Sequence, residues 1–94
     1  MIPITKALSM IKDEEECSRI LKDLLTPQEF KNLEERWRVA QILDTEQKSY
    51  RDIAKETGVS VTTIGRIARF LHSEPYQGYR ILLDRTCKTQ QNKG

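Results

Sequence analysis

Apolar residues recur every three or four positions along most of the chain, which predicts an array of helices without internal repeats. A short apolar segment over residues 4–11 is followed by a break at Lys12 or Asp13. Asp13 can cap a second helix, whose first turn holds three glutamates and whose later turns carry a strong apolar stripe. Residues 76–85 predict a final packing helix.

A long central helix is predicted to begin at Pro27. Thr26 can cap it, and Glu29 completes a capping box. The apolar residues of this helix cover more than one narrow stripe: Phe30, Leu33, Trp37, Val39, Ala40, Ile42 and Leu43. This width favours contact with two neighbours, one in the same chain and one in a second subunit, although Trp37 could equally be ordinary core.

The segment SYRDIAKETGVSVTTIGRIARFL, residues 49–71, has the register of a helix-turn-helix. Gly58 stands just past the first helix, where a residue without Cβ can turn the chain. Ser49 and Ser60 can cap the two helices, whereas Thr57 occupies a place where an apolar residue is more usual. The positions that crossing helices must bury carry Ile53, Ala54, Val59, Ile64 and Ile67.

Helix pairs of this kind also occur in bundles that never touch nucleic acid, but the agreement of all these positions favours DNA binding.

Length and charge modify this picture. The 94 residues suffice for one domain with a small core, which dimerisation would enlarge. The net charge of +2 is too small to indicate nucleic acid by itself. However, the first 35 residues carry five basic and eight acidic groups, and the remainder carries eleven basic and six acidic groups. Positive charge therefore concentrates in the part that contains the helix-turn-helix.

Several function classes are not expected. Cys17 and Cys87 form no CxxC pair, so we predict no metal site, and no cofactor is indicated. The single histidine, His72, has no evident catalytic partner, so we expect no enzyme and no catalytic residue. No apolar run is long enough to cross a bilayer and no cleavage pattern follows the N-terminus, so we expect a cytoplasmic protein without a membrane partner.

In order, LLTPQEF, ERWRVAQIL and SYRDIAKETGVSVTTIGRIARFL resemble the Trp repressor family of bacterial DNA-binding proteins over residues 24–83. The resemblance implies an all-α fold, a Trp repressor-like intertwined helical homodimer whose two helix-turn-helix heads face a palindromic operator. Residues 1–25 would be N-terminal dimerisation helices, 26–88 the central helix, helix-turn-helix and final helix, and 89–94 a disordered tail. The apolar excess of Leu24, Leu25, Trp37 and Val39 fits such a dimer independently.

The candidate DNA-binding residues are Arg51, Lys55, Ser60, Thr62, Thr63, Arg66 and Arg69. The two threonines lie nearest the start of the second helix and are the best candidates for base contact, and the two arginines that follow can reach base edges or phosphates. Arg51 and Lys55 match the side of the first helix that faces DNA in the family, although Lys55 could equally be a solvated surface charge. Gly65, inside the second helix, costs roughly 1 kcal/mol relative to alanine and permits close approach either to DNA or to a neighbouring helix.

Arg36 and Arg66 match residues that flank the ligand in tryptophan-binding members of the family. Where those members have small residues, this chain has Ile67 and Phe70, which would fill the site with hydrocarbon. We therefore predict a vestigial ligand pocket formed by these four residues and no binding of tryptophan. Arg36 would then serve as a structural cation.

Together these features predict a sequence-specific transcription regulator, a repressor that binds double-stranded DNA as a homodimer without tryptophan. Two alternatives remain open. One is a protein-interaction module that uses the helix-turn-helix as a packing unit. The other is a repressor that depends on a small effector other than tryptophan.

Overall fold

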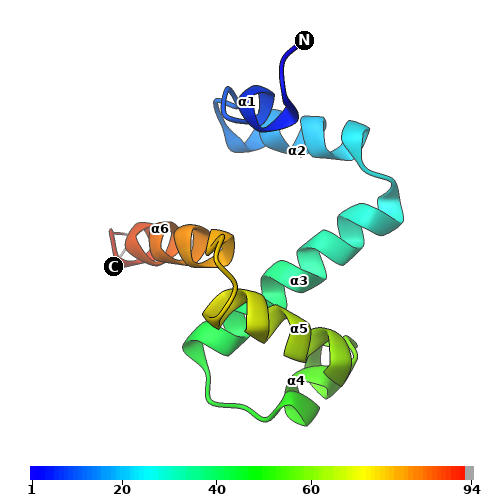
Figure 1. Ribbon diagram of the computed structural model, residues 1–94, viewed down its shortest axis with the longest axis vertical. Coiled ribbons are helices and arrows are strands. Elements are labelled where there is room, and N and C mark those ends of the chain that lie inside the picture. The colour runs from blue at the N-terminus through cyan, green and yellow to red at the C-terminus, as the bar shows by residue number, and fades with distance from the viewer. Residues whose placement is uncertain (93–94) are drawn as a thin grey trace. The chain divides into compact units, whose positions relative to one another are not determined.

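The computed structural model describes the backbone of residues 1–92 and the side chains of residues 1–87. Helices are the regular structure throughout this part of the chain, which confirms the all-α class (Figure 1). Their bounds are α1 Ile4–Leu8, α2 Glu14–Leu24, α3 Pro27–Thr45, α4 Tyr50–Thr57, α5 Val61–His72 and α6 Gly78–Asn92. The chain divides into two compact units, residues 1–32 and residues 33–94, which are described separately.

The first unit holds α1 and α2. The segment expected to be helical over residues 4–11 ends at Leu8. The Met10 and Ile11 backbone N–H groups then donate to the carbonyls three residues back, at 3.1 and 3.2 Å, as in a turn. Asp13 caps α2 as predicted, with its Oδ1 accepting from the Glu16 backbone N–H at 2.8 Å. None of residues 1–32 is buried.

The start of α3 is fixed by the predicted capping box. The Thr26 N–H donates to Glu29 Oε1 at 2.8 Å, and the Glu29 N–H donates to Thr26 Oγ1 at 3.1 Å. Each side chain satisfies a backbone donor that a helix N-terminus otherwise leaves unpaired. Pro27 occupies the first helical position, where its missing N–H costs nothing.

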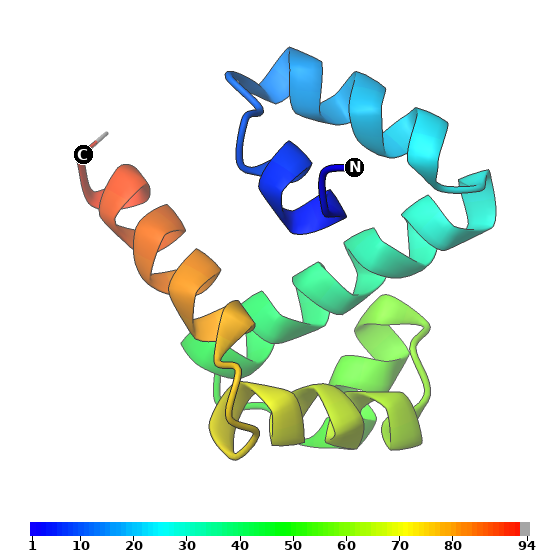
Figure 2. The same ribbon diagram turned by 45° about the horizontal axis from the view of Figure 1, so that its top comes forward.

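The second unit contains the core, which joins the C-terminal half of α3 to α4 and α5 (Figure 2). Its buried residues are Val39, Ala40, Ile42, Ile53, Val59, Ile64 and Ile67, with Trp37, Leu43, Ala54 and Tyr79 packed against them. The residues predicted for the crossing of the two helices of the motif are thus all in this cluster. Ala68 and Leu71 extend the buried face of α5.

The turn between α4 and α5 has the predicted geometry. Gly58 has φ 79°, the left-handed conformation that glycine adopts without strain. Ser49 Oγ accepts from the Asp52 N–H at 3.1 Å and Ser60 Oγ accepts from the Thr63 N–H at 3.2 Å, so both serines cap their helices. Thr57, which departs from the expected pattern, donates its hydroxyl to the Ile53 carbonyl at 2.7 Å and accepts from the Val59 N–H at 3.1 Å.

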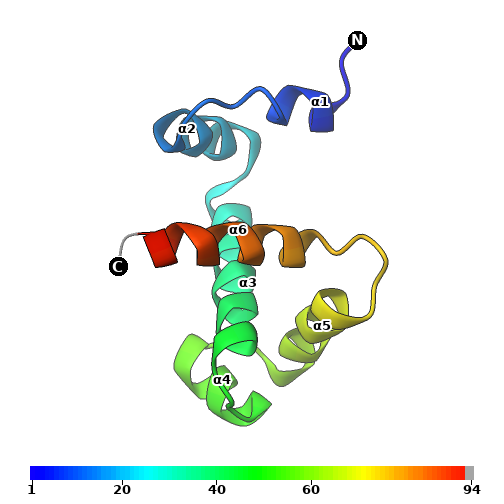
Figure 3. The ribbon, with the colours of Figure 1, turned by 90° about the vertical axis from the view of Figure 1, so that its left-hand side faces the viewer.

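Helix α6 begins at Gly78, two residues later than predicted, because Gln77 adopts φ 53° and interrupts the helix. Leu83 is buried, and Arg80 forms a bidentate ion pair with Asp44 on α3, at 2.8 and 3.1 Å. Figure 3 shows α6 leaving the turn that follows α5. The helix continues to Asn92, so residues 89–92 of the expected disordered tail are helical; no Gly or Pro in residues 86–92 opposes this. Residues 93–94 lie outside the described residues.

Candidate nucleic-acid interface

The outer face of the helix-turn-helix carries most of the candidate residues. On α5, the buried face points into the core, and Thr62, Arg66 and Arg69 remain exposed on the opposite side. On α4, Arg51 and Lys55 are exposed, whereas Ile53 is fully buried. The amphipathic pattern that builds the core therefore also leaves the cationic side chains of both helices on their exposed faces.

The start of α5 is held by a local network. Besides accepting from the Thr63 N–H, the Ser60 hydroxyl donates to Thr63 Oγ1 at 3.0 Å. Both hydroxyls therefore have partners within the chain, and Thr63 is only half-exposed. Thr62 is exposed one residue earlier, at the N-terminal turn that a helix-turn-helix points toward base edges.

Arg69 has an intramolecular partner that sequence reasoning missed. Its Nε lies 2.7 Å from Glu74 Oε1, in the turn that follows α5. The Arg69 side chain is 71% exposed and that of Glu74 is 26% exposed, so water screens the pair and a phosphate can compete for the guanidinium. The only signal in the sequence was the five-residue spacing across a helix end, which occurs by chance too often to indicate a contact.

A second ionic cluster fixes the loop before α4. Lys48 Nζ lies 2.6 Å from Glu56 Oε2 and 3.0 Å from Glu46 Oε1, and Arg38 approaches Glu56 at 4.0 Å. Hydrogen bonding to Lys48 lowers the pKa of Glu56 and hydrogen bonding to Glu56 raises the pKa of Lys48. The pair thus ties the end of α4 to the loop that precedes it, and neither residue was a candidate from the sequence.

A pocket of about 200 Å³ lies beside α5, the second helix of the helix-turn-helix. It brings together the four residues predicted to form a vestigial ligand site, and it is lined by Arg36, Thr63, Arg66, Ile67, Phe70 and Tyr79. Burial raises the pKa of Tyr79, and the charge of Arg36 acts in the opposite direction. Tyr79 comes from α6, so its place in the pocket depended on long-range packing that the sequence pattern did not reveal.

The expectation that two bulky side chains fill this pocket needs correction in one respect. Ile67 is buried at 4% exposure, but Phe70 is 44% exposed and lines the pocket without closing it. The physical reason is that the core takes up one face of α5, and Phe70 lies beside that face and not within it. Whether tryptophan binds stays a prediction.

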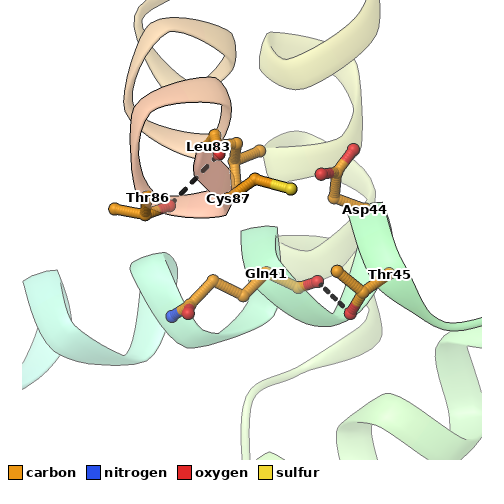
Figure 4. A pocket seen from close by; sticks show the side chains of 6 residues that line it. All are labelled: Gln41, Asp44, Thr45, Leu83, Thr86 and Cys87. Atoms are coloured by element: carbon orange, nitrogen blue, oxygen red, sulfur yellow. Dashed lines mark hydrogen bonds between the residues drawn. The ribbon is translucent and has the colours of Figure 1, made fainter. Parts of the chain in front are cut away.

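Another pocket, of about 160 Å³, lies between α3 and α6 and holds none of the candidate residues (Figure 4). Its lining residues are Gln41, Asp44, Thr45, Leu83, Thr86 and Cys87. The Thr45 hydroxyl donates to the Gln41 carbonyl at 2.8 Å, and the Thr86 hydroxyl donates to the Leu83 carbonyl at 3.2 Å. Both hydroxyls thus serve their own helices, and we assign this pocket no function.

Metal ions and membranes are two further kinds of partner that a small helical protein can have. Among the residues that the structure describes, no three His, Cys, Asp or Glu side chains group in a way that could hold a metal ion. In the same part of the chain, no helix has the length and apolar character needed to span a membrane.

Comparison with known proteins identifies relatives of this arrangement. The family model described as "Trp repressor protein" matches residues 3–87. The uncharacterised protein YerC of Bacillus subtilis (strain 168) is 40% identical over 80 residues, which cover 85% of this chain and 75% of the relative. A crystal structure of a TrpR-like protein from Eubacterium eligens is 34% identical and superposes with a TM-score of 0.78, covering 88% of this chain and 84% of the other.

Proposed function

The chain belongs to the Trp repressor family, a family of DNA-binding regulators, and from that premise we propose that it is a sequence-specific transcriptional repressor. In this proposal it acts as a homodimer, blocks a promoter by occupying a palindromic operator, and needs no tryptophan to bind. The residues that contact DNA are those of the outer face of α4 and α5 together with the cap of α5: Arg51, Lys55, Ser60, Thr62, Thr63, Arg66 and Arg69.

One observation carries the proposal. Thr62, Arg66 and Arg69 form an exposed stripe on the second helix of a well-formed helix-turn-helix, and the opposite face of that helix is buried in the core. A stripe with hydroxyls at the N-terminal end and guanidinium groups behind it suits the major groove, where the helix start meets base edges and later cations meet bases or phosphates.

The exposure of large apolar side chains outside the core supports dimerisation. Ile4, Met10, Leu24 and Leu33 are each between 45% and 58% exposed in the single chain. A second copy would cover such residues and would present two recognition helices. In a symmetric dimer of this class the half-sites lie about one turn of DNA apart, on the order of 34 Å.

The direct test is selection of bound fragments from random duplex DNA at physiological salt, without added ligand. We expect the selected fragments to share a palindrome, and we expect affinity for it to fall steeply with rising salt as counterions are released. A protein-interaction module would instead select no shared sequence. That result would sink the proposal.

A charge-matched pair of variants then tests the stripe itself. Replacing Arg66 and Arg69 by alanine should weaken binding to the selected duplex at least 100-fold and reduce the salt slope by about 2. The control replaces Arg19 and Lys31, two exposed cations of residues 1–32, and removes the same charge. Equal losses from both double variants would show that only net charge matters, contrary to the proposal.

The absence of a tryptophan requirement is tested separately. Ile67 and Phe70 support it, because they place two large hydrocarbon side chains along the pocket wall. Calorimetry with tryptophan should show no saturable heat at micromolar concentrations, and the selected palindrome should bind equally well with and without it. The remaining cavity beside Arg36 and Arg66 favours, as a second candidate, an effector of different shape, which ligand screening against DNA binding would find.

A further inference from the structure

Gly65 is half-buried and lies between Thr62 and Arg66 of the exposed stripe of α5, at a position where the chain itself needs no glycine. Its neighbours on the same side of the helix are Thr62, three residues earlier, and Arg69, four residues later. Glycine lowers helix stability in such an interior position, because it has more conformational freedom to lose on folding. A benefit must therefore offset this cost if the residue is functional.

The benefit does not come from packing within the chain. A Cβ built on Gly65 would have the Tyr50 ring as its nearest neighbour, at 3.8 Å from Cε2, which is ordinary van der Waals contact. The backbone at Gly65 does not have the positive φ that requires glycine, in contrast to Gly58. Alanine would thus fit here without displacing α4, so the close approach of a neighbouring helix is excluded as the reason.

We infer that the missing side chain leaves room for a base edge at the floor of the major groove, so that Gly65 sets how deeply α5 enters the duplex. The inference rests on the proposed function and deepens it by naming a residue that determines specificity through the absence of atoms. Gly65 is the fifth residue of α5, within the N-terminal part of a recognition helix that meets base edges. A methyl group there would hold the helix away from the bases that Thr62 and Arg66 reach.

The test compares Gly65→Ala with Gly78→Ala in the full-length protein. Gly78 is another helical glycine. Nothing lies within 4 Å of a Cβ built on it, and it begins α6, away from the stripe. We expect Gly65→Ala to raise the melting temperature by roughly 4 °C, because it removes an interior helical glycine. It should nevertheless bind the selected palindrome at least tenfold more weakly, the size of one lost base contact. Gly78→Ala should bind like the wild type.

Non-specific binding separates a loss of base recognition from a general loss of DNA affinity. Because phosphate charges hold non-specific complexes, the affinity of Gly65→Ala for a scrambled duplex should change less than threefold. Equal affinity of Gly65→Ala and wild type for the palindrome would overturn the inference, and so would an equal loss on both duplexes. A change in oligomeric state alone, measured by sedimentation, would assign the glycine to a contact between copies and would also overturn it. If the wild type selects no DNA, the proposed function fails first and this inference falls with it.

Discussion

The two units of the chain differ in how they are stabilised. Residues 33–94 contain every buried residue that the structure describes, with Ile53 and Ile64 fully enclosed between α3, α4 and α5. Residues 1–32 contain none, although α2 carries a regular apolar stripe, and Leu24 is 55% exposed. Only the second unit therefore has a core of its own.

This difference shows that an apolar stripe buried within the chain and one that is not can look alike in sequence. The apolar stripe of α2 is as regular as that of α5, yet the α5 stripe is buried within the chain, whereas Ile20 and Leu21 of α2 are half-buried and Leu24 is exposed. Burial of apolar surface is the main favourable contribution to folding, so the first unit gains little of it from a single chain. We propose that it gains the rest from a second copy.

The largest expected effect comes from breaking the core of the second unit. Ile64→Ala removes a fully buried side chain and should lower the free energy of unfolding by about 3 kcal/mol, a large share of the stability of a small domain. Urea unfolding followed by circular dichroism measures this. Val61→Ala, on the same helix but 46% exposed, is the control and should cost under about 0.5 kcal/mol. Similar costs for the two would mean that α5 is not packed as described.

A charge placed in the first unit should weaken association of the proposed dimer. Leu24→Asp puts a carboxylate on a side chain that is exposed in one chain and, in the proposed dimer, buried. We expect the dimer dissociation constant to rise at least tenfold, as seen by sedimentation over a range of concentrations. Asn32→Asp adds the same charge at another exposed position of residues 1–32 and should leave it unchanged. A monomeric wild type would remove the proposed reason for the exposure of Leu24.

Local interactions should matter in the first unit even without a core. Thr26→Ala deletes one half of the capping box at the start of α3 and should cost about 1 kcal/mol. Thr26→Ser keeps the hydroxyl and should restore most of it. Thermal unfolding of the three proteins at equal concentration gives the comparison. An unchanged melting temperature for Thr26→Ala would show that the cap contributes nothing.

The smallest effect concerns the ion pair between α3 and α6. The Arg80 guanidinium lowers the pKa of Asp44 from its ordinary value of 3.8, so the native state favours the ionised carboxyl. Its contribution is present above the unfolded value, near pH 3.8, and is lost as the pH falls further through the lowered native value. Asp44→Asn should therefore melt a few degrees below the wild type at pH 7, and the difference should vanish in acid. Asp23→Asn, an exposed control, should melt near the wild type at pH 7, and a pH-independent deficit for Asp44→Asn would contradict the assigned role of the ion pair.

The parts of the fold that sequence reasoning predicted depend on neighbours in the chain. Asp13, Thr26, Ser49 and Ser60 cap helices within three residues, and Gly58 turns the chain where it stands. The buried face of α5 follows from spacing alone. The seven DNA candidates were placed by the same logic, and the structure puts Arg51, Lys55, Thr62, Arg66 and Arg69 on the exposed surface of one motif.

What the sequence did not reveal depends on residues far apart in the chain or on exceptional backbone angles. The Arg80–Asp44 pair spans 36 positions, and Tyr79 reaches the pocket only because α6 lies where it does. The later start of α6 depends on the positive φ of Gln77, a residue type that rarely adopts it. The exposure of Phe70 likewise depends on which side of α5 the core occupies. A shift of that side by one residue would change whether Phe70 is buried.

The bend at Gly58 also has a consequence for the order in which the chain acquires structure. Because α4 and α5 are adjacent in sequence, most of the contacts between them close short loops, which is the property of fast-folding helical domains. The helix-turn-helix can therefore assemble in a step whose rate does not depend on protein concentration. In the proposed dimer, docking of residues 1–32 against a second copy is bimolecular, so at low protein concentration it would be the slower of the two events.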